Sequence, residues 1–271
     1  MKLCVSTLCC PEMDFFELCA VAKDIGYSGI EIRKLGNESY APKMYPFIAR
    51  KLDSTIEKLK RISIDIPLLS SKAVIGVRGK DEDSLKEIKD YIDLARLIGS
   101  KYIRIFGGKS PQGGEFDEKL ALEQIGKISD LLKGTDVEVL IETNGVFNDS
   151  DYMAEFLKKC GEDSFGALWD INYPYRYNDE TPAKTAEALK EWIRFAHIKD
   201  SKESEYGTEF CLMGEGTLPI DESLQALSKI GFNGFLSFEW SLKWSGELVD
   251  PGIVISHYAS FMQRKMKKLG I

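Results

Sequence analysis

The amino-acid sequence predicts an α/β protein that folds as a single (β/α)8 TIM barrel over residues 1–271. Three observations support this: eight apolar runs typical of buried strands, amphipathic segments between them, and a recurring junction at which a helix ends and a strand begins. Alternation of strands and helices produces parallel strands. Eight such units favour a closed barrel over an open doubly wound sheet, and a chain of about 250 residues commonly forms one barrel.

The strand-like runs are short and rich in apolar residues, as expected of strands buried on both faces. They are residues 3–8, 29–33, 62–68, 102–106, 137–143, 165–171, 194–199 and 234–240. Residues 15–25 and 85–98 between them show the spacing of amphipathic helices. Asp14 followed by Glu17 resembles a capping box at the start of the first of these helices.

The helix-to-strand junctions resemble one another. Residues 25–30 are similar to residues 230–235, and residues 98–103 are a looser copy. Each begins with the end of a helix, followed by a glycine, a short loop and a strand. We expect the glycines to adopt the left-handed conformation that ends a helix. They are Gly26, Gly99 and Gly231.

Composition excludes several classes of function. The net charge is −7 and no basic cluster occurs, which argues against nucleic acid as the main partner. The sequence contains no apolar stretch long enough to cross a membrane and no export signal. Its six cysteines form no C-x-x-C pair. We therefore expect a cytoplasmic protein with reduced thiols and no membrane partner.

A glycine-rich segment follows the fourth predicted strand. Residues 107–114 lack the spacing of a loop that cradles phosphate. We interpret them as a long surface connection, with a lid over the barrel mouth as the alternative.

Four of the predicted strands carry a metal-competent side chain near their C-terminal ends. Isolated charges at the ends of apolar strands are costly unless a partner or an ion compensates them. The C-terminal rim of such a barrel carries the active site, so groups from consecutive strands can converge there. They are Glu142, Asp170, His197 and Glu239. Three carboxylates and an imidazole suit one divalent cofactor ion, such as Mn²⁺, Mg²⁺, Co²⁺ or Zn²⁺.

Six short motifs extend this pattern. They are I-R-I-F-G-G (103–108), I-E-T-N-G (141–145), L-W-D-I-N-Y-P-Y-R (168–176), H-I-K-D-S (197–201), M-G-E-G (213–216) and F-E-W (238–240). With them the chain resembles the sugar phosphate isomerase/epimerase group of xylose isomerase-like TIM barrels. The resemblance implies that Glu142 and Glu239 bind the ion and act as the catalytic groups on the sugar carbon between them. It also implies that Asp170 and His197 complete the metal shell.

The chemistry implied is proton transfer next to a carbonyl. Two carboxylates on opposite faces of a carbon can remove and return a proton, giving epimerisation or aldose–ketose isomerisation. A related metal-dependent dehydratase acting on a keto-polyol is an alternative, as is a catalytically impaired carbohydrate-binding homologue. A repair nuclease of the same barrel type is disfavoured because the chain has only two histidines and is acidic.

Substrate contacts are also predicted. The family often has a histidine before the proline at position 174, where this chain has Tyr173, and that change alters the contact made there. Lys199 lies two residues after His197 and so points the same way. Further candidates to bind substrate are Arg104, Asn144 and Trp240. Arg33, Arg104, Arg176 or Lys202 would hold a phosphate or carboxylate, or else form rim salt bridges. The partner is a small sugar or sugar derivative, with a homo-oligomer possible.

Overall fold

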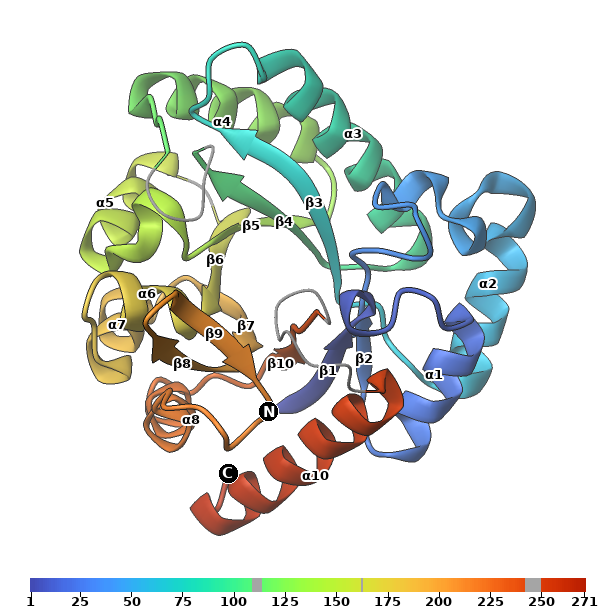
Figure 1. Cartoon of the computed structure of the whole chain (residues 1–271). Coiled ribbons are helices and arrows are strands. Elements are labelled where there is room, and N and C mark those ends of the chain that lie inside the picture. Colours follow the sequence, from blue (N-terminus) through green and yellow to red (C-terminus); the bar gives the residue numbers. More distant parts are fainter. Residues whose placement is uncertain (109–113, 162, 242–249) are drawn as a thin grey trace.

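One parallel sheet forms the centre of the molecule, and helices surround it (Figure 1). The computed structural model describes residues 1–108, 114–161, 163–241 and 250–271. The eight strands lie in the order β2-β1-β10-β7-β6-β5-β4-β3. Their bounds are β1 Lys2–Ser6, β2 Gly29–Glu31, β3 Leu68–Ile75, β4 Tyr102–Gly107, β5 Glu138–Glu142, β6 Phe165–Asp170, β7 Ile193–Ile198 and β10 Phe235–Phe238.

The sheet closes between its two end strands, β2 and β3. Ile32 bridges Leu69 in parallel fashion, and Gly29 bridges Asp65. The Ile32 amide donates to the Leu68 carbonyl at 3.0 Å, and the Ser70 amide donates to the Ile32 carbonyl at 2.8 Å. The ring of strands is therefore continuous, and the predicted (β/α)8 barrel is confirmed.

Helices follow the strands around the ring. They are α1 Phe15–Asp24, α2 Ala49–Ile62, α3 Asp81–Ile98, α4 Glu118–Leu132, α5 Ser150–Cys160, α6 Asn172–Tyr177, α7 Pro182–Leu189, α8 Ile220–Lys229 and α10 Pro251–Leu269. Asp14 caps α1, as predicted, by accepting hydrogen bonds from the amides of Phe16 and Glu17. Gly26, Gly99 and Gly231 have φ angles of 99°, 74° and 74°, as their positions after helices predict.

The third strand lies later in the chain than the sequence suggested. Residues 62–68 were expected to form it, because apolar side chains alternate there. Instead α2 continues to Ile62 and ends at Ser63, which has a left-handed conformation, and β3 begins only at Leu68. Ile64 and Ile66 are buried in the connection, so their alternation reflects packing of a linker.

The inside of the barrel is layered. Five buried side chains form an apolar cluster separate from the main core: Cys4, Leu68, Leu140, Leu168 and Phe195. Side chains two residues further along a strand point to the same face. That step leads to Ser70 on β3, Glu142 on β5, Asp170 on β6 and His197 on β7. The polar groups of the barrel mouth therefore lie directly above a layer of apolar side chains.

A hairpin not foreseen from the sequence follows β7. Strands β8 (Asp200–Ser204) and β9 (Gly207–Cys211) pair in antiparallel fashion. The buried Asp200 carboxylate accepts hydrogen bonds from the amides of Gly214 at 2.8 Å and Gly216 at 3.1 Å. This carboxylate therefore connects the H-I-K-D-S motif to the M-G-E-G motif and fixes the loop after the hairpin.

Three further expectations concern the cysteines, membrane-spanning segments and the glycine-rich segment. All six cysteines are free and buried. Among the described residues, no helix combines the length and apolar character needed to cross a membrane. The lid proposed for the glycine-rich segment rests on residues 109–113, which lie outside the described part of the chain.

Substitution of Gly216 tests the loop held by Asp200. A Cβ there would lie 2.1 Å from Asp200 Oδ1 and 2.5 Å from the Ser201 carbonyl oxygen. We expect Gly216→Ala to lower the free energy of unfolding by about 1–3 kcal/mol in urea titrations, the usual cost of overpacking. Gly126→Ala in α4 is the matched control, because nothing lies within 4 Å of its added Cβ and the change favours a helix. Equal stability of the two variants would contradict the tight contact.

Candidate active site

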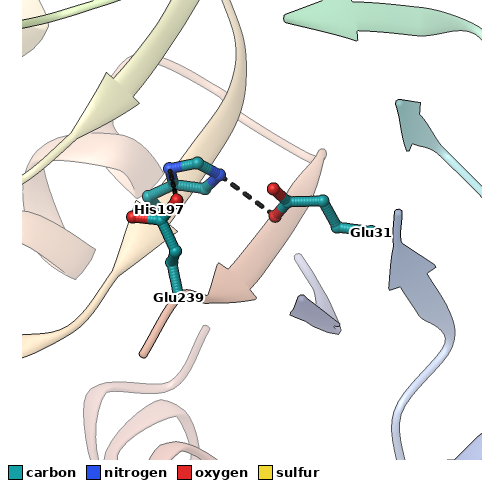
Figure 2. Close-up of side chains that lie close together, drawn as sticks. All are labelled: Glu31, His197 and Glu239. Atoms are coloured by element: carbon teal, nitrogen blue, oxygen red, sulfur yellow. Dashed lines mark hydrogen bonds and ion pairs between the residues drawn. The ribbon is translucent and has the colours of Figure 1, made fainter. Parts of the chain in front are cut away.

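His197 lies between two carboxylates at the barrel mouth (Figure 2). Its Nε2 atom is 3.1 Å from Glu31 Oε2, and its Nδ1 atom is 3.7 Å from Glu239 Oε1. Glu31 is the last residue of β2 and accepts two further hydrogen bonds, from Ser70 at 2.6 Å and Ser237 at 2.7 Å. An ionised carboxylate only accepts, so Nε2 carries the proton and Nδ1 offers its lone pair in a neutral imidazole.

Nδ1 of His197 points at further acidic groups. It is 3.8 Å from Asp170 Oδ2, and within the described chain no hydrogen bond reaches it. Ligand atoms of Glu142, Asp170 and His197 lie within 4.8 Å of one another, as do those of Glu31, His197 and Glu239. An imidazole nitrogen without a hydrogen bond, surrounded by carboxylate oxygens, is a donor set that fits a divalent cation. The predicted ligands thus meet around His197, which belongs to both groups: Glu142 and Asp170 lie in one and Glu239 in the other.

Glu142 is held on both of its oxygens. Arg104 on β4 donates to Oε2 at 3.0 Å, and Asn144 donates to Oε1 at 3.0 Å. Arg104 is 1% exposed and Glu142 is 2% exposed, so this ion pair is shielded from water. The guanidinium also lies over the Phe106 ring, with 3.9 Å between its central carbon and the ring centroid.

Two more cations neutralise the other ligands. Lys199 Nζ is 2.5 Å from Asp170 Oδ2 and also pairs with Glu239 Oε2. Arg33, just after β2, pairs with Glu239 Oε1. Each carboxylate of the predicted metal set therefore already has a cationic partner from this chain.

These contacts shift the pKa values of the buried groups. Burial by itself would lower the pKa of His197, but the adjacent Glu31 and Asp170 carboxylates raise it above its usual value. Burial by itself would raise the pKa of Asp170, but Lys199 and His197 lower it below its usual value. The pKa of Glu31 is likewise held well below its usual range by His197 and the two serines, against the effect of burial. A metal ion would have to compete with a proton for Nδ1.

Two of the predicted substrate-binding residues, Tyr173 and Trp240, have different surroundings. Tyr173 lies beside the centre, as we call the cluster of His197 with the carboxylates of Glu31, Glu142, Asp170 and Glu239. Its ring centroid is 5.4 Å from Lys199 Nζ. Burial and the charges of Asp170 and Glu142 raise the pKa of Tyr173, so its phenol remains a hydrogen-bond donor. Trp240 is 1% exposed and packs in the main core. Its role in binding substrate stays a prediction.

Four basic residues were predicted to hold a phosphate or carboxylate. One of them, Arg176, makes hydrogen bonds away from the centre. It donates to the Ser201 carbonyl at 2.6 Å and to Thr217 at 2.7 Å, which ties the hairpin to the loop after it. Lys202 lies exposed on β8. Arg33 and Arg104 are the two that meet the predicted metal ligands.

Sequence reasoning missed the part played by Glu31. The residue ends a short apolar strand, which is the same signal that singled out the four predicted ligands. Its partner, His197, is 166 positions away in the sequence. Recognising the pair needs the strand order, which brings β2, β1, β10 and β7 together.

A cavity opens beside the centre. Its volume is about 750 Å³, which is within the usual range for small-molecule sites. Arg33 and Ser241 line it, together with apolar residues from the loop after β1 and from the start of α10: Leu8, Cys9, Cys10, Pro11, Met13 and Pro251.

Comparison with known proteins agrees with the barrel fold. The family described as xylose isomerase-like TIM barrel matches residues 19–253. An inosose isomerase of Bacillus velezensis is 24% identical over 186 residues, a match that covers 63% of this chain and 66% of that protein.

Solved structures share the fold over nearly the whole chain. The IolI protein with a bound zinc atom has a TM-score of 0.81 at 18% identity, covering 99% of each chain. The probable 3-DHS dehydratase AsbF of Bacillus anthracis has a TM-score of 0.79 at 18% identity, covering 97% of this chain and 99% of that one. D-psicose 3-epimerase of Clostridium cellulolyticum H10, solved with D-tagatose, has a TM-score of 0.78 at 14% identity, covering 99% of each.

Removing the Arg104 charge tests the buried pair with Glu142. In protein treated with EDTA, we expect Arg104→Met to lower the free energy of unfolding by about 3–5 kcal/mol, because Glu142 is left charged and buried. The double variant Arg104→Met/Glu142→Leu should recover much of this loss in urea titrations. Arg78→Met is the control: its pair with Asp117 is at the surface, so stability should stay at the parent value. A similar small effect for both arginines would contradict the inferred burial.

Proposed function

Because the chain belongs to the xylose isomerase-like TIM-barrel family, we propose that it is a divalent-metal-dependent isomerase or epimerase of a sugar or sugar derivative. One observation carries the metal dependence. His197 Nδ1 has no hydrogen bond among the described residues and faces the oxygens of Asp170 and Glu239, while Glu31 holds the other ring nitrogen. The ligands proposed are Glu142, Asp170, His197 and Glu239.

Glu142 and Glu239 are the proposed proton-transfer groups. A divalent ion bound here would polarise a sugar carbonyl and its neighbouring hydroxyl, which acidifies the C–H bond beside them. One glutamate takes that proton. For epimerisation the other glutamate, in its protonated form, gives its own proton to the opposite face of the carbon; for isomerisation the first glutamate returns the proton to the neighbouring carbon. Arg104 and Asn144 orient Glu142 for this by holding both of its oxygens.

Tyr173 and Lys199 are the proposed contacts to substrate oxygens. The raised pKa of Tyr173 keeps the phenol protonated, so it donates a hydrogen bond without changing its charge. Lys199 lies between Asp170 and Glu239, which sets its ammonium beside the proposed reacting carbon. Neither residue is needed to hold the ion.

Exchange of solvent deuterium into substrate tests the reaction. The manganese-loaded protein is incubated in deuterated water with D-psicose, D-tagatose and a keto-inositol, and the products are read by NMR and mass spectrometry. We expect deuterium at the carbon next to the carbonyl. Glu142→Gln and Glu239→Gln should each slow the exchange by about 10²–10⁴-fold while leaving the circular dichroism spectrum unchanged.

The control for this experiment is Glu215→Gln, because Glu215 is exposed in the M-G-E-G loop and should keep the parent rate. Loss of water from the keto-inositol would assign the dehydratase alternative. A protein that binds manganese and sugar but gives no exchange with any of the three would be a carbohydrate-binding homologue. Parent rates in both glutamine variants would refute the mechanism.

Glu31 is proposed to set the orientation of His197 toward the ion. We expect Glu31→Gln to weaken Mn²⁺ binding by about 10–100-fold in calorimetric titrations, since it removes the charged partner of a ligating imidazole. Glu180→Gln is the matched control: Glu180 is also buried and accepts hydrogen bonds from Ser150 and Thr185, but outside the centre. The idea fails if both variants bind Mn²⁺ with equal strength.

A further inference from the structure

The barrel mouth holds more positive charge than a metal site of carboxylates requires. Among the residues that the structure describes, its carboxylates are those of Glu31, Glu142, Asp170 and Glu239. The cations paired with the last three are Arg104, Lys199 and Arg33. With a neutral imidazole, four carboxylates against three cations leave one negative charge. A divalent ion would turn this into one positive charge.

An unbalanced buried charge is costly, and it favours a ligand of opposite sign. The walls of the cavity carry no excess of positive charge that would attract an anion. Three basic residues line it (Arg33, Lys34 and Lys72), and so do three acidic ones (Glu12, Glu17 and Asp250). Preference for an anion would therefore come from the metal-loaded centre.

Arg33 is the cation of the centre that a ligand can reach. Its side chain is 23% exposed and lines the cavity, whereas Arg104 and Lys199 are each 1% exposed. A guanidinium presents parallel N–H groups that match a carboxylate or a phosphate. Arg33 thus stands between the cavity and Glu239, with one of its contacts already made to a carboxylate.

We propose that the substrate is acidic, a sugar derivative with a carboxylate or phosphate group that Arg33 binds. This rests on the proposed metal-dependent function. Glu239 would leave Arg33 when it becomes a metal ligand, and the substrate anion replaces it as the partner of the guanidinium. Metal and anion then bind cooperatively, each raising the affinity of the other by the same factor.

Three-carbon probes test this without knowledge of the full substrate. Calorimetry measures the binding of D-glycerate, glycerol 3-phosphate and glycerol to the protein with Mn²⁺ and after EDTA treatment. We expect at least one of the two anions to bind tenfold or more tightly than glycerol when Mn²⁺ is present, and to lose that advantage without it. The comparison of glycerate with glycerol phosphate identifies the anionic group.

Substitution of Arg33 distinguishes a role in anion binding from a purely structural role. We expect Arg33→Gln to weaken anion binding by about 10–100-fold, the effect of losing a charged hydrogen bond. The same variant should bind Mn²⁺ more tightly, because a positive competitor for Glu239 is gone. A residue needed only for folding would weaken both. Arg33→Lys should fall between the parent and Arg33→Gln, and Arg50→Gln, at an exposed position of α2, should match the parent.

Two results would overturn the inference: equal affinity for the two anions and glycerol in the manganese-loaded protein, or anion binding unaffected by Arg33→Gln. Failure of the proposed function is read separately, from the Mn²⁺ titration without any probe. If Mn²⁺ does not bind, the metal-dependent function falls and the inference that rests on it falls with it, whereas Mn²⁺ binding without any preference for the anions overturns the inference alone.

Discussion

Neutralisation of buried charge at the barrel mouth is the constraint on which the rest of this structure depends. Parallel strands that close into a ring turn every second side chain inward, where little water remains. Charged groups there must pair with one another or with an ion, because an isolated buried charge is costly. The chain meets this requirement with alternating acids and bases: Arg104 faces Glu142, Lys199 faces Asp170, and Arg33 faces Glu239.

The same pairing has a consequence for metal binding. Without internal cations, three carboxylates around one point would repel each other and oppose folding. Arg33 and Lys199 relieve that repulsion, so the acids converge before an ion arrives. A metal ion must then displace or coexist with these cations, which lowers its affinity relative to an all-acid cage. The acidic groups are therefore held together without an ion, and the affinity for the proposed metal would depend on what else binds to the cations that it displaces.

The barrel and the convergence of the predicted ligands were accessible from sequence because both depend on local patterns. An apolar run that ends in one acid or imidazole is visible residue by residue, and chain order alone makes the four strands neighbours in a barrel. The third strand was misplaced because apolar alternation in a buried linker imitates a strand, while the left-handed Ser63 that ends α2 has no sequence signal as strong as a glycine. Salt bridges of Arg33 and Arg104 were an open alternative from the sequence, but the acid that each one meets was not accessible, because it depends on register and side-chain reach.

Glu31 connects closure of the barrel to orientation of the proposed ligand. The seam between β2 and β3 rests on isolated bridges, whereas each other pair of neighbouring strands in the ring forms a hydrogen-bonded ladder. Glu31 reaches across it to Ser70 on β3 and also binds Ser237 on β10 and His197 on β7. One carboxylate therefore ties four strands together and fixes the imidazole at the same time. Loosening of the seam would move His197 Nδ1 relative to Asp170 and Glu239, so the geometry of the centre depends on the contact between β2 and β3.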